Sequence, residues 1–177
     1  MTNLNSLLMR FPVYIILSTS VFIYSCTGSK STSAQSNDFP GEPADSLVAS
    51  IERTRCFGVC PYYNIKIFRS GYVLYEGYDN VPNVGRYYTW LTPRQLTEMG
   101  LKAEETGYFN LDNEYRNPYL TDFPTIYTEV RFRGKRKKIT HYTAEPPANL
   151  DEMEKYLDAM FTKETNWILH PVQDLKD

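Results

Sequence analysis

The stretch YNIKIFRSGYVLY, residues 63–75, places two strand-like runs on either side of a short turn. Apolar side chains recur at every second position of each run, which is the period of a half-buried β-strand. A three-residue loop with Gly71 in the left-handed conformation suits the connection. The stretch therefore predicts an antiparallel hairpin. Its expected cross-strand pairs are Ile67 with Val73 and Ile65 with Tyr75.

Similar patterns surround this hairpin. Further strands are predicted at residues 47–52, 86–91, 126–132 and 136–142, the last two forming a second hairpin around Gly134. Thr92 to Gln95 reads as a capping box with proline at the first helical position, so a helix is predicted to start there. A second helix is predicted to be capped at Asn149. Residues 108–124 between the helices are predicted to form a long loop.

The fold class follows from the order of these elements. The predicted order is β-β-β-β-α-β-β-α, with no internal repeat of solenoid length. Two runs of strands, each followed by a helix, predict a single-domain α+β fold. We expect an antiparallel β-sheet built from two meanders or hairpins, with two α-helices packed on one face.

The first residues indicate export and a lipid anchor. Phe11 to Tyr24 is an uncharged apolar stretch preceded by Arg10, too short for a spanning helix of roughly 20 residues. It ends in Ile23-Tyr24-Ser25-Cys26, which resembles the lipobox of bacterial lipoproteins, in which the cysteine carries the lipid, commonly including palmitate. An ordinary signal peptide cut nearby is the alternative.

These features divide the chain into four parts. We expect a lipoprotein signal peptide at 1–25, then the lipidated Cys26 with a flexible Ser/Gly/Pro-rich tether at 26–45. The folded domain is expected at 46–169, within the usual single-domain size range, and a C-terminal tail at 170–177.

Charge and compartment exclude some functions. Without Arg10 the chain has 18 basic and 21 acidic residues, which gives no general attraction to nucleic acid. We expect the bacterial cell envelope, with the lipid in the outer membrane and the domain facing the periplasm. Disulfides persist in such a compartment.

Several motifs recur together in the order of one known family. They are C-F-G-V-C-P-Y-Y (56–63), S-G-Y-V-L-Y-E-G (70–77), T-D-F-P-T (121–125), G-K-R-K-K-I (134–139) and N-W-I (166–168). The chain therefore resembles the bacterial family of domain of unknown function 6438, from about Ser46 to Ile168. The resemblance implies an extracytoplasmic domain, often on lipoproteins, and carries over no activity.

Cys56 and Cys60 admit three interpretations. An oxidising compartment and an even pair of cysteines favour a disulfide across a tight bend, with Gly58 supplying a permissive backbone and the bond holding Phe57 and Tyr63 at the start of the sheet. Thiol–disulfide exchange is the second interpretation, but it needs a low-pKa thiolate, typically at a helix N-terminus. The residues after Cys60 alternate as in a strand.

The third interpretation is a copper site formed by Cys56, Cys60 and His141. The C-x-x-x-C-P motif with a distant histidine is similar to that of the Sco copper chaperones, and thiolates with imidazole suit copper. His141 shares strand parity with Ile139 and should point inward, however. A lone inward histidine is more often a core residue whose ring nitrogens find partners.

A cluster of positive charge marks the second hairpin. It could hold anionic lipid headgroups, phosphates or an acidic partner, or it could be a solvated face that protects a sheet edge from pairing. The candidate residues are Arg131, Arg133, Lys135, Arg136, Lys137 and Lys138.

Taken together, the sequence predicts a lipid-anchored envelope domain with a binding or structural role. No nucleophile motif, phosphate loop or paired acid and base is recognisable, so we expect neither an enzyme nor a small-molecule substrate. We expect no cofactor and a partner that is an envelope protein or an anionic surface. The alternative is a copper or thiol–disulfide carrier using Cys56, Cys60 and His141.

The lipid anchor can be tested directly. Replacing the acylated thiol by a hydroxyl, Cys26→Ser, should abolish incorporation of labelled palmitate and shift the protein from the membrane to the soluble fraction. Metabolic labelling with cell fractionation measures both. Full labelling and membrane retention of the variant would contradict the lipoprotein prediction.

Overall fold

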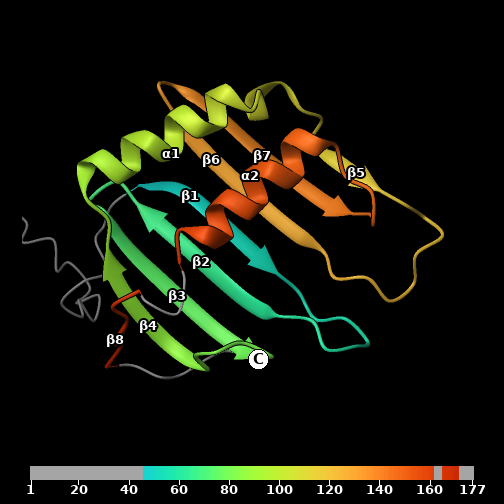
Figure 1. The fold of residues 1–177 in the computed structure, drawn as a ribbon, viewed down its shortest axis with the longest axis horizontal. Helices are drawn as coiled ribbons and strands as arrows, with labels where there is room; N and C mark the ends of the chain where they lie inside the picture. Colours follow the sequence, from blue (N-terminus) through green and yellow to red (C-terminus); the bar gives the residue numbers. More distant parts are fainter. Residues whose placement is uncertain (1–45, 162–164, 172–177) are drawn as a thin grey trace, which may run out of the picture. The chain divides into compact units, whose positions relative to one another are not determined.

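The computed structural model describes residues 46–161 and 165–171 (Figure 1). The predicted signal peptide, the predicted lipid attachment site at Cys26, the predicted tether up to residue 45 and residues 172–177 of the predicted tail lie outside the described residues. None of the helices within the described ranges is long and apolar enough to cross a bilayer.

One β-sheet contains all eight strands of the described residues. The strands are β1 (Leu47–Arg53), β2 (Tyr62–Phe68), β3 (Tyr72–Asp79), β4 (Gly85–Trp90), β5 (Glu114–Arg116), β6 (Ile126–Phe132), β7 (Lys135–Tyr142) and β8 (Ile168–Leu169). Their order across the sheet is β5-β7-β6-β1-β2-β3-β4-β8. Every pairing is antiparallel except that of β5 with β7, which is parallel.

The predicted fold, an antiparallel sheet in the order β-β-β-β-α-β-β-α, is therefore wrong. The sheet is mixed, because residues 114–116 of the predicted loop form β5 and run parallel to β7. A further short strand, β8, pairs with β4 at the other edge. These two strands have only three and two residues, which is too short for an alternating pattern to be recognised.

The first hairpin has the predicted register. Ile65 lies opposite Tyr75 and Ile67 opposite Val73. Gly71 has φ +91°, the left-handed region that favours glycine. A side chain at Gly71 would also collide with the Leu91 carbonyl oxygen, so the turn needs glycine for two reasons.

Two helices cover the same face of the sheet (Figure 1). They are α1 (Pro93–Glu105) and α2 (Ala148–Ala159), and the short 3-10 helix η1 (Tyr108–Asn110) follows α1. Alternate residues of β1, β2 and β6 face the helices and form a continuous apolar core with them. Its buried members include Ala49, Ile51, Ile65, Ile67, Val130, Met99, Ala103, Leu150, Met153 and Leu157.

Of the two predicted helix caps, one is correct and one is wrong. The capping box at Thr92 and Gln95 is present: the Thr92 hydroxyl accepts from the Gln95 amide, and the Gln95 side chain accepts from the Thr92 amide. The predicted cap at Asn149 is wrong, because α2 begins at Ala148 after Pro147. Pro147 lacks an N–H, and its carbonyl accepts from the amides of Leu150 and Asp151.

The second hairpin turns at Arg133 and Gly134, with φ +49° and +77°. Positive φ at both central residues is typical of the type I′ turn that matches the twist of a two-residue hairpin. Arginine seldom adopts this conformation, so the turn holds a charged side chain where asparagine is usual. The Arg133 guanidinium lies 4.9 Å from the centre of the Phe132 ring.

Close packing of α1 on this hairpin depends on Gly100. A Cβ atom at Gly100 would lie 2.1 Å from the Phe132 ring. Gly→Ala in a free helix stabilises by up to about 1 kcal/mol. Here we expect Gly100→Ala to lower the free energy of unfolding by about 1–3 kcal/mol, because the core is overpacked.

Urea unfolding of the full chain measures this change. Phe132→Leu removes part of the ring, so the double variant Gly100→Ala/Phe132→Leu should lose less stability than the sum of the single variants. A Gly100→Ala protein as stable as the wild type would contradict the packing argument.

Candidate functional site

A groove of about 460 Å³ lies at the turn end of the β6–β7 hairpin, in the size range of ligand sites. We call it the hairpin groove. Its lining combines cationic and apolar side chains. The lining residues are Val48, Arg69, Leu96, Thr97, Met99, Arg131, Phe132, Arg133, Gly134, Lys135 and Arg136.

Four segments bring five cations to this groove. Arg69 comes from the β2–β3 turn, Arg131 from β6, Arg133 from the hairpin turn, and Lys135 and Arg136 from β7. Apolar side chains form another part of the lining, which we call the apolar wall. They are Val48 on β1, Leu96 and the almost fully buried Met99 on α1, and Phe132 on β6.

Two carboxylates of the described chain contact these cations. Glu104 on α1 binds Lys135 at 2.9 Å and Arg133 at 3.2 Å. Glu129 on β6 binds Arg131 at 2.6 Å and Arg136 at 2.9 Å. Five cations thus face two anions, which leaves a surplus of three positive charges at the groove.

Both carboxylates stay ionised beside these partners. The hydrogen bond from Lys135, followed by the charges of Lys135 and Arg133, lowers the pKa of Glu104 despite partial desolvation. Burial alone would raise the pKa of Glu129, which is only 6 % exposed, but the hydrogen bonds from Arg136 and Arg131 lower it overall. The carboxylates therefore hold the cations in place.

The hairpin groove includes four of the six predicted cationic residues. Arg131, Arg133, Lys135 and Arg136 line it. Lys137 and Lys138 do not. The Lys138 ammonium lies over the Tyr127 ring, and Lys137 is opposite Val130 in the β6–β7 pairing.

Sequence reasoning missed Arg69 and both carboxylates. Glu129 and Arg131 are two apart on one strand and share a face, which is a recognisable signal. Arg69 and Glu104 carry no such signal. Arg69 is distant in sequence, and Glu104 reaches the hairpin only because α1 packs on it.

The chemistry of the lining comes from its guanidinium and ammonium groups. Among the described residues the lining contains no histidine, cysteine or carboxylate that could act as a general acid or base. Guanidinium groups bind carboxylates and phosphates through paired hydrogen bonds. The hairpin groove can therefore hold an anionic group next to apolar matter.

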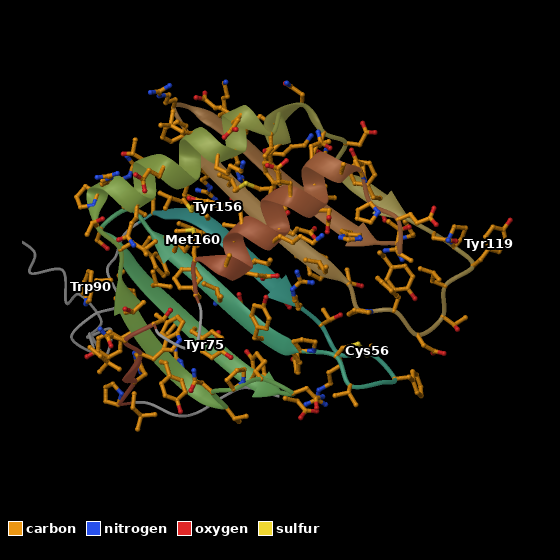
Figure 2. The ribbon with its side chains drawn as sticks, in the orientation of Figure 1. Cys56, Tyr75, Trp90, Tyr119, Tyr156 and Met160 are labelled. Atoms are coloured by element: carbon orange, nitrogen blue, oxygen red, sulfur yellow. A yellow bond between two sulfur atoms is a disulfide. The ribbon has the colours of Figure 1, made fainter. Side chains whose placement is uncertain are left out.

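The predicted disulfide is present. Cys56 and Cys60 are bonded, with Cα atoms 5.9 Å apart, in the loop between β1 and β2. This loop and the 117–125 loop extend from the same end of the sheet, where Cys56 and Tyr119 are labelled in Figure 2. The Thr54 amide donates to the Thr125 carbonyl and ties the two loops together.

Two details of the disulfide prediction are wrong. Phe57 is not held at the start of the sheet: it is 92 % exposed, and Val59 is 87 % exposed. Gly58 does not adopt a positive φ. Its amide instead donates to the Cys56 sulfur, and a Cβ atom there would be at ordinary contact distance, so the bend does not require glycine.

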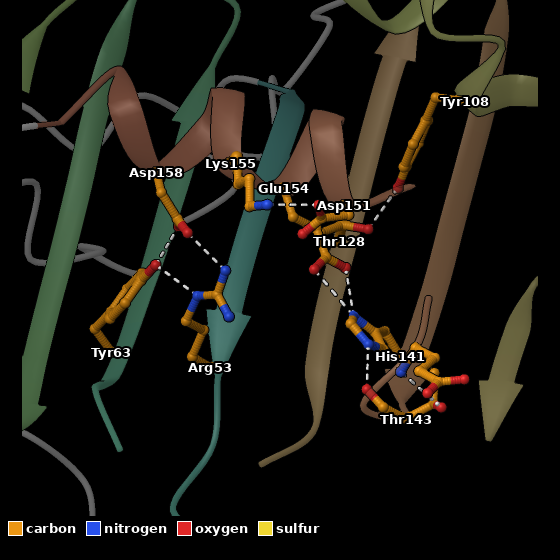
Figure 3. A network of polar contacts seen from close by, with 11 residues as sticks. Arg53, Tyr63, Tyr108, Thr128, His141, Thr143, Asp151, Glu154, Lys155 and Asp158 are labelled. Atoms are coloured by element: carbon orange, nitrogen blue, oxygen red, sulfur yellow. Dashed lines mark hydrogen bonds and ion pairs between the residues drawn. The ribbon is translucent and has the colours of Figure 1, made fainter. Parts of the chain in front are cut away.

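His141 is a buried core residue, as predicted (Figure 3). Its Nδ1 lies 3.0 Å from both carboxylate oxygens of Glu154 on α2, and its Nε2 donates to the Thr143 carbonyl at 2.8 Å. Both ring nitrogens face acceptors. The arrangement is fully bonded when the imidazole carries two protons and Glu154 is ionised.

A second polar cluster lies one helical turn further along α2 (Figure 3). Asp158 binds the Arg53 guanidinium at 2.6 Å and accepts from the Tyr63 hydroxyl, which also accepts from Arg53 Nε at 3.0 Å. Burial and the charge of Asp158 raise the pKa of Tyr63 well above its usual value. The phenol therefore remains a donor.

The structure does not bring His141 to the two cysteines. Its nitrogens contact Glu154 and Thr143, while both sulfurs are in the disulfide. In the described part of the chain, no group of three His, Cys, Asp or Glu side chains is arranged to hold a metal. A copper site would need reduction of the disulfide and release of His141, and it stays a prediction.

Over its described residues, the chain is thus defined by one mixed eight-stranded sheet with two helices on one face, a short disulfide loop and a cationic groove. Residues 48–161 match the family described as a domain of unknown function (DUF6438). The chain belongs to this family. Comparison with curated proteins finds no match.

The buried pair predicts a pH dependence of stability. Burial lowers the pKa of His141, but the hydrogen bond and charge of Glu154 and the Thr143 carbonyl outweigh it, so the net pKa lies above 6.5. The stabilisation is therefore complete below about pH 6.5 and is lost as the pH rises through the folded-state value. We expect the free energy of unfolding to fall as the pH rises above about 6.5.

Glu154→Gln is the matched variant for this test. It keeps the shape but removes the charge, and should cost about 1.5–3 kcal/mol at pH 6. It should also flatten the pH dependence, because His141 then gains less from protonation. Urea unfolding at several pH values measures both effects. Parallel curves for the two proteins would contradict the assignment.

Proposed function

We propose that this chain is a lipid-anchored, non-enzymatic binding module of the bacterial cell envelope, and that the hairpin groove is its binding site. The observation that carries the proposal is the surplus of three positive charges around one groove. Anionic groups are the ligands that such a surplus favours, especially near a low-dielectric wall.

The anchor in this proposal is the lipidated Cys26, in the outer membrane, with the domain on the periplasmic side. Support comes from the lipobox-like Ile23-Tyr24-Ser25-Cys26 and from the disulfide between Cys56 and Cys60, which suits an oxidising compartment. Under this proposal the partner is an anionic envelope component, and nucleic acid is not among the candidates.

The cations of the hairpin groove, and not cations elsewhere on the domain, should determine how tightly the protein binds an immobilised phosphate surface. We expect the full chain, in a neutral detergent, to bind phosphocellulose. Arg133→Glu/Lys135→Glu should weaken the interaction by about 5–100-fold, since each lost ion pair contributes up to roughly 1 kcal/mol and reversal adds repulsion. Elution salt concentration measures the loss.

A control variant has the same net charge. Arg94→Glu/Arg116→Glu reverses two exposed cations that do not line the groove and that are also paired, with Glu98 and Glu114. It should elute close to the wild type. Equal elution of the two double variants would show that total charge, and not the groove, governs binding, and would overturn the proposed site.

A further inference from the structure

We infer that the ligand of the hairpin groove is an anionic membrane lipid, with its phosphate headgroup on the cations and the first part of an acyl chain on the apolar wall. This inference rests on the proposed function and specifies its ligand. Three independent features of the groove point to an amphiphile rather than to a small inorganic anion.

The first feature is the mixed lining of the groove. Its cations come from the second hairpin and from the β2–β3 turn, and Leu96 of α1, Val48 of β1 and Phe132 of β6 add apolar surface. A small anion would be bound by the cations alone and would leave the apolar wall exposed. Apolar matter there is stabilised by about 25 cal/mol per Å² removed from water.

The second feature is the way the cations are held. Arg133 lies in a left-handed turn conformation over the Phe132 ring, and its guanidinium also contacts Glu104. Lys135 contacts the same carboxylate, and its ammonium lies 5.6 Å from the Phe109 ring. Each charged group thus sits beside an aromatic surface, at the boundary between polar and apolar matter, where a headgroup joins its acyl chain.

The third feature is where the chain enters the domain. Ser46 is the first described residue, and its hydroxyl accepts a hydrogen bond from Nε of Arg69, which lines the groove. The amide of Arg69 also donates to the Ser46 carbonyl at 3.1 Å. Among the described residues, Ser46 is the one nearest in sequence to the proposed anchor at Cys26. It lies beside the groove, and not at the disulfide end of the sheet.

The proposed lipid site lies away from the polar clusters on α2. The Arg53, Tyr63 and His141 contacts lie at the start of β6, whereas the hairpin groove lies at its end. The buried network thus stabilises the fold without using the groove cations. A lipid bound in the groove would not compete with it.

Native mass spectrometry of the full chain in neutral detergent tests the inference. We expect one bound phosphatidylglycerol per chain, and at least tenfold weaker binding of phosphatidylcholine with the same acyl chains. Dodecanoate, which offers a carboxylate and an acyl chain, should also bind at least tenfold more weakly than phosphatidylglycerol. Equal binding of phosphatidylcholine, or dodecanoate as tight as phosphatidylglycerol, would overturn the assignment to an anionic phospholipid.

Variants on α1 test the apolar wall. Leu96→Asn, in the groove, should weaken phosphatidylglycerol binding by about tenfold, as expected when roughly 50 Å² of apolar contact is lost and a polar group takes its place. Leu101→Asn, an exposed position of the same helix that does not line the groove, should have little effect. Melting curves confirm that both variants are folded.

The outcomes separate the inference from the proposed function. If Leu96→Asn binds phosphatidylglycerol as the wild type does while Arg133→Glu/Lys135→Glu does not, the groove binds an anion but the acyl contact is wrong. If Arg133→Glu/Lys135→Glu binds the lipid as the wild type does, the groove is not the site, and the proposed function fails with the inference.

Discussion

The pairing of β1 with both β2 and β6 is the constraint on which the rest of the structure depends. It joins β2-β3-β4-β8 to β6-β7-β5, two sets of strands that are far apart in the sequence. Ala49 and Ile51 of β1 are almost fully buried beneath the helices, so this strand also lies at the centre of the core. Since a one-residue shift would turn both side chains to the opposite face, their burial fixes the register in which β1 joins the two sets of strands.

Polar interactions fix α2 on this sheet at one end. Glu154 and Asp158 are one helical turn apart and therefore share a face of the helix. Each reaches a basic residue in the same row of the sheet, His141 on β7 and Arg53 on β1, on either side of Ile126. Only the His141–Glu154 pair is fully buried, and the Arg53–Asp158 pair is partly exposed. Buried ion pairs add less to stability than their geometry suggests, so these contacts position the helix more than they stabilise it.

At the other end of β6, α1 and the second hairpin meet closely because Gly100 admits the Phe132 ring. This contact brings Glu104 to Arg133 and Lys135, and brings Leu96 and Met99 to the wall of the hairpin groove. Packing and charge are thus coupled. The same approach of helix and hairpin that completes the core also creates a site lined by both cationic and apolar side chains.

The sequence by itself determined several local features of this protein. The hairpin register around Gly71, the capping box at Thr92 and the inward His141 follow from periodicity and turn chemistry, and the disulfide is the favoured of three interpretations for Cys56 and Cys60. Only the tertiary structure decided the rest. The strands β5 and β8 are too short to carry a pattern, and their pairing depends on distant partners. The groove likewise depends on Arg69 and Glu104, which approach the hairpin only through the packing of other elements, and no local pattern encodes contacts of that kind.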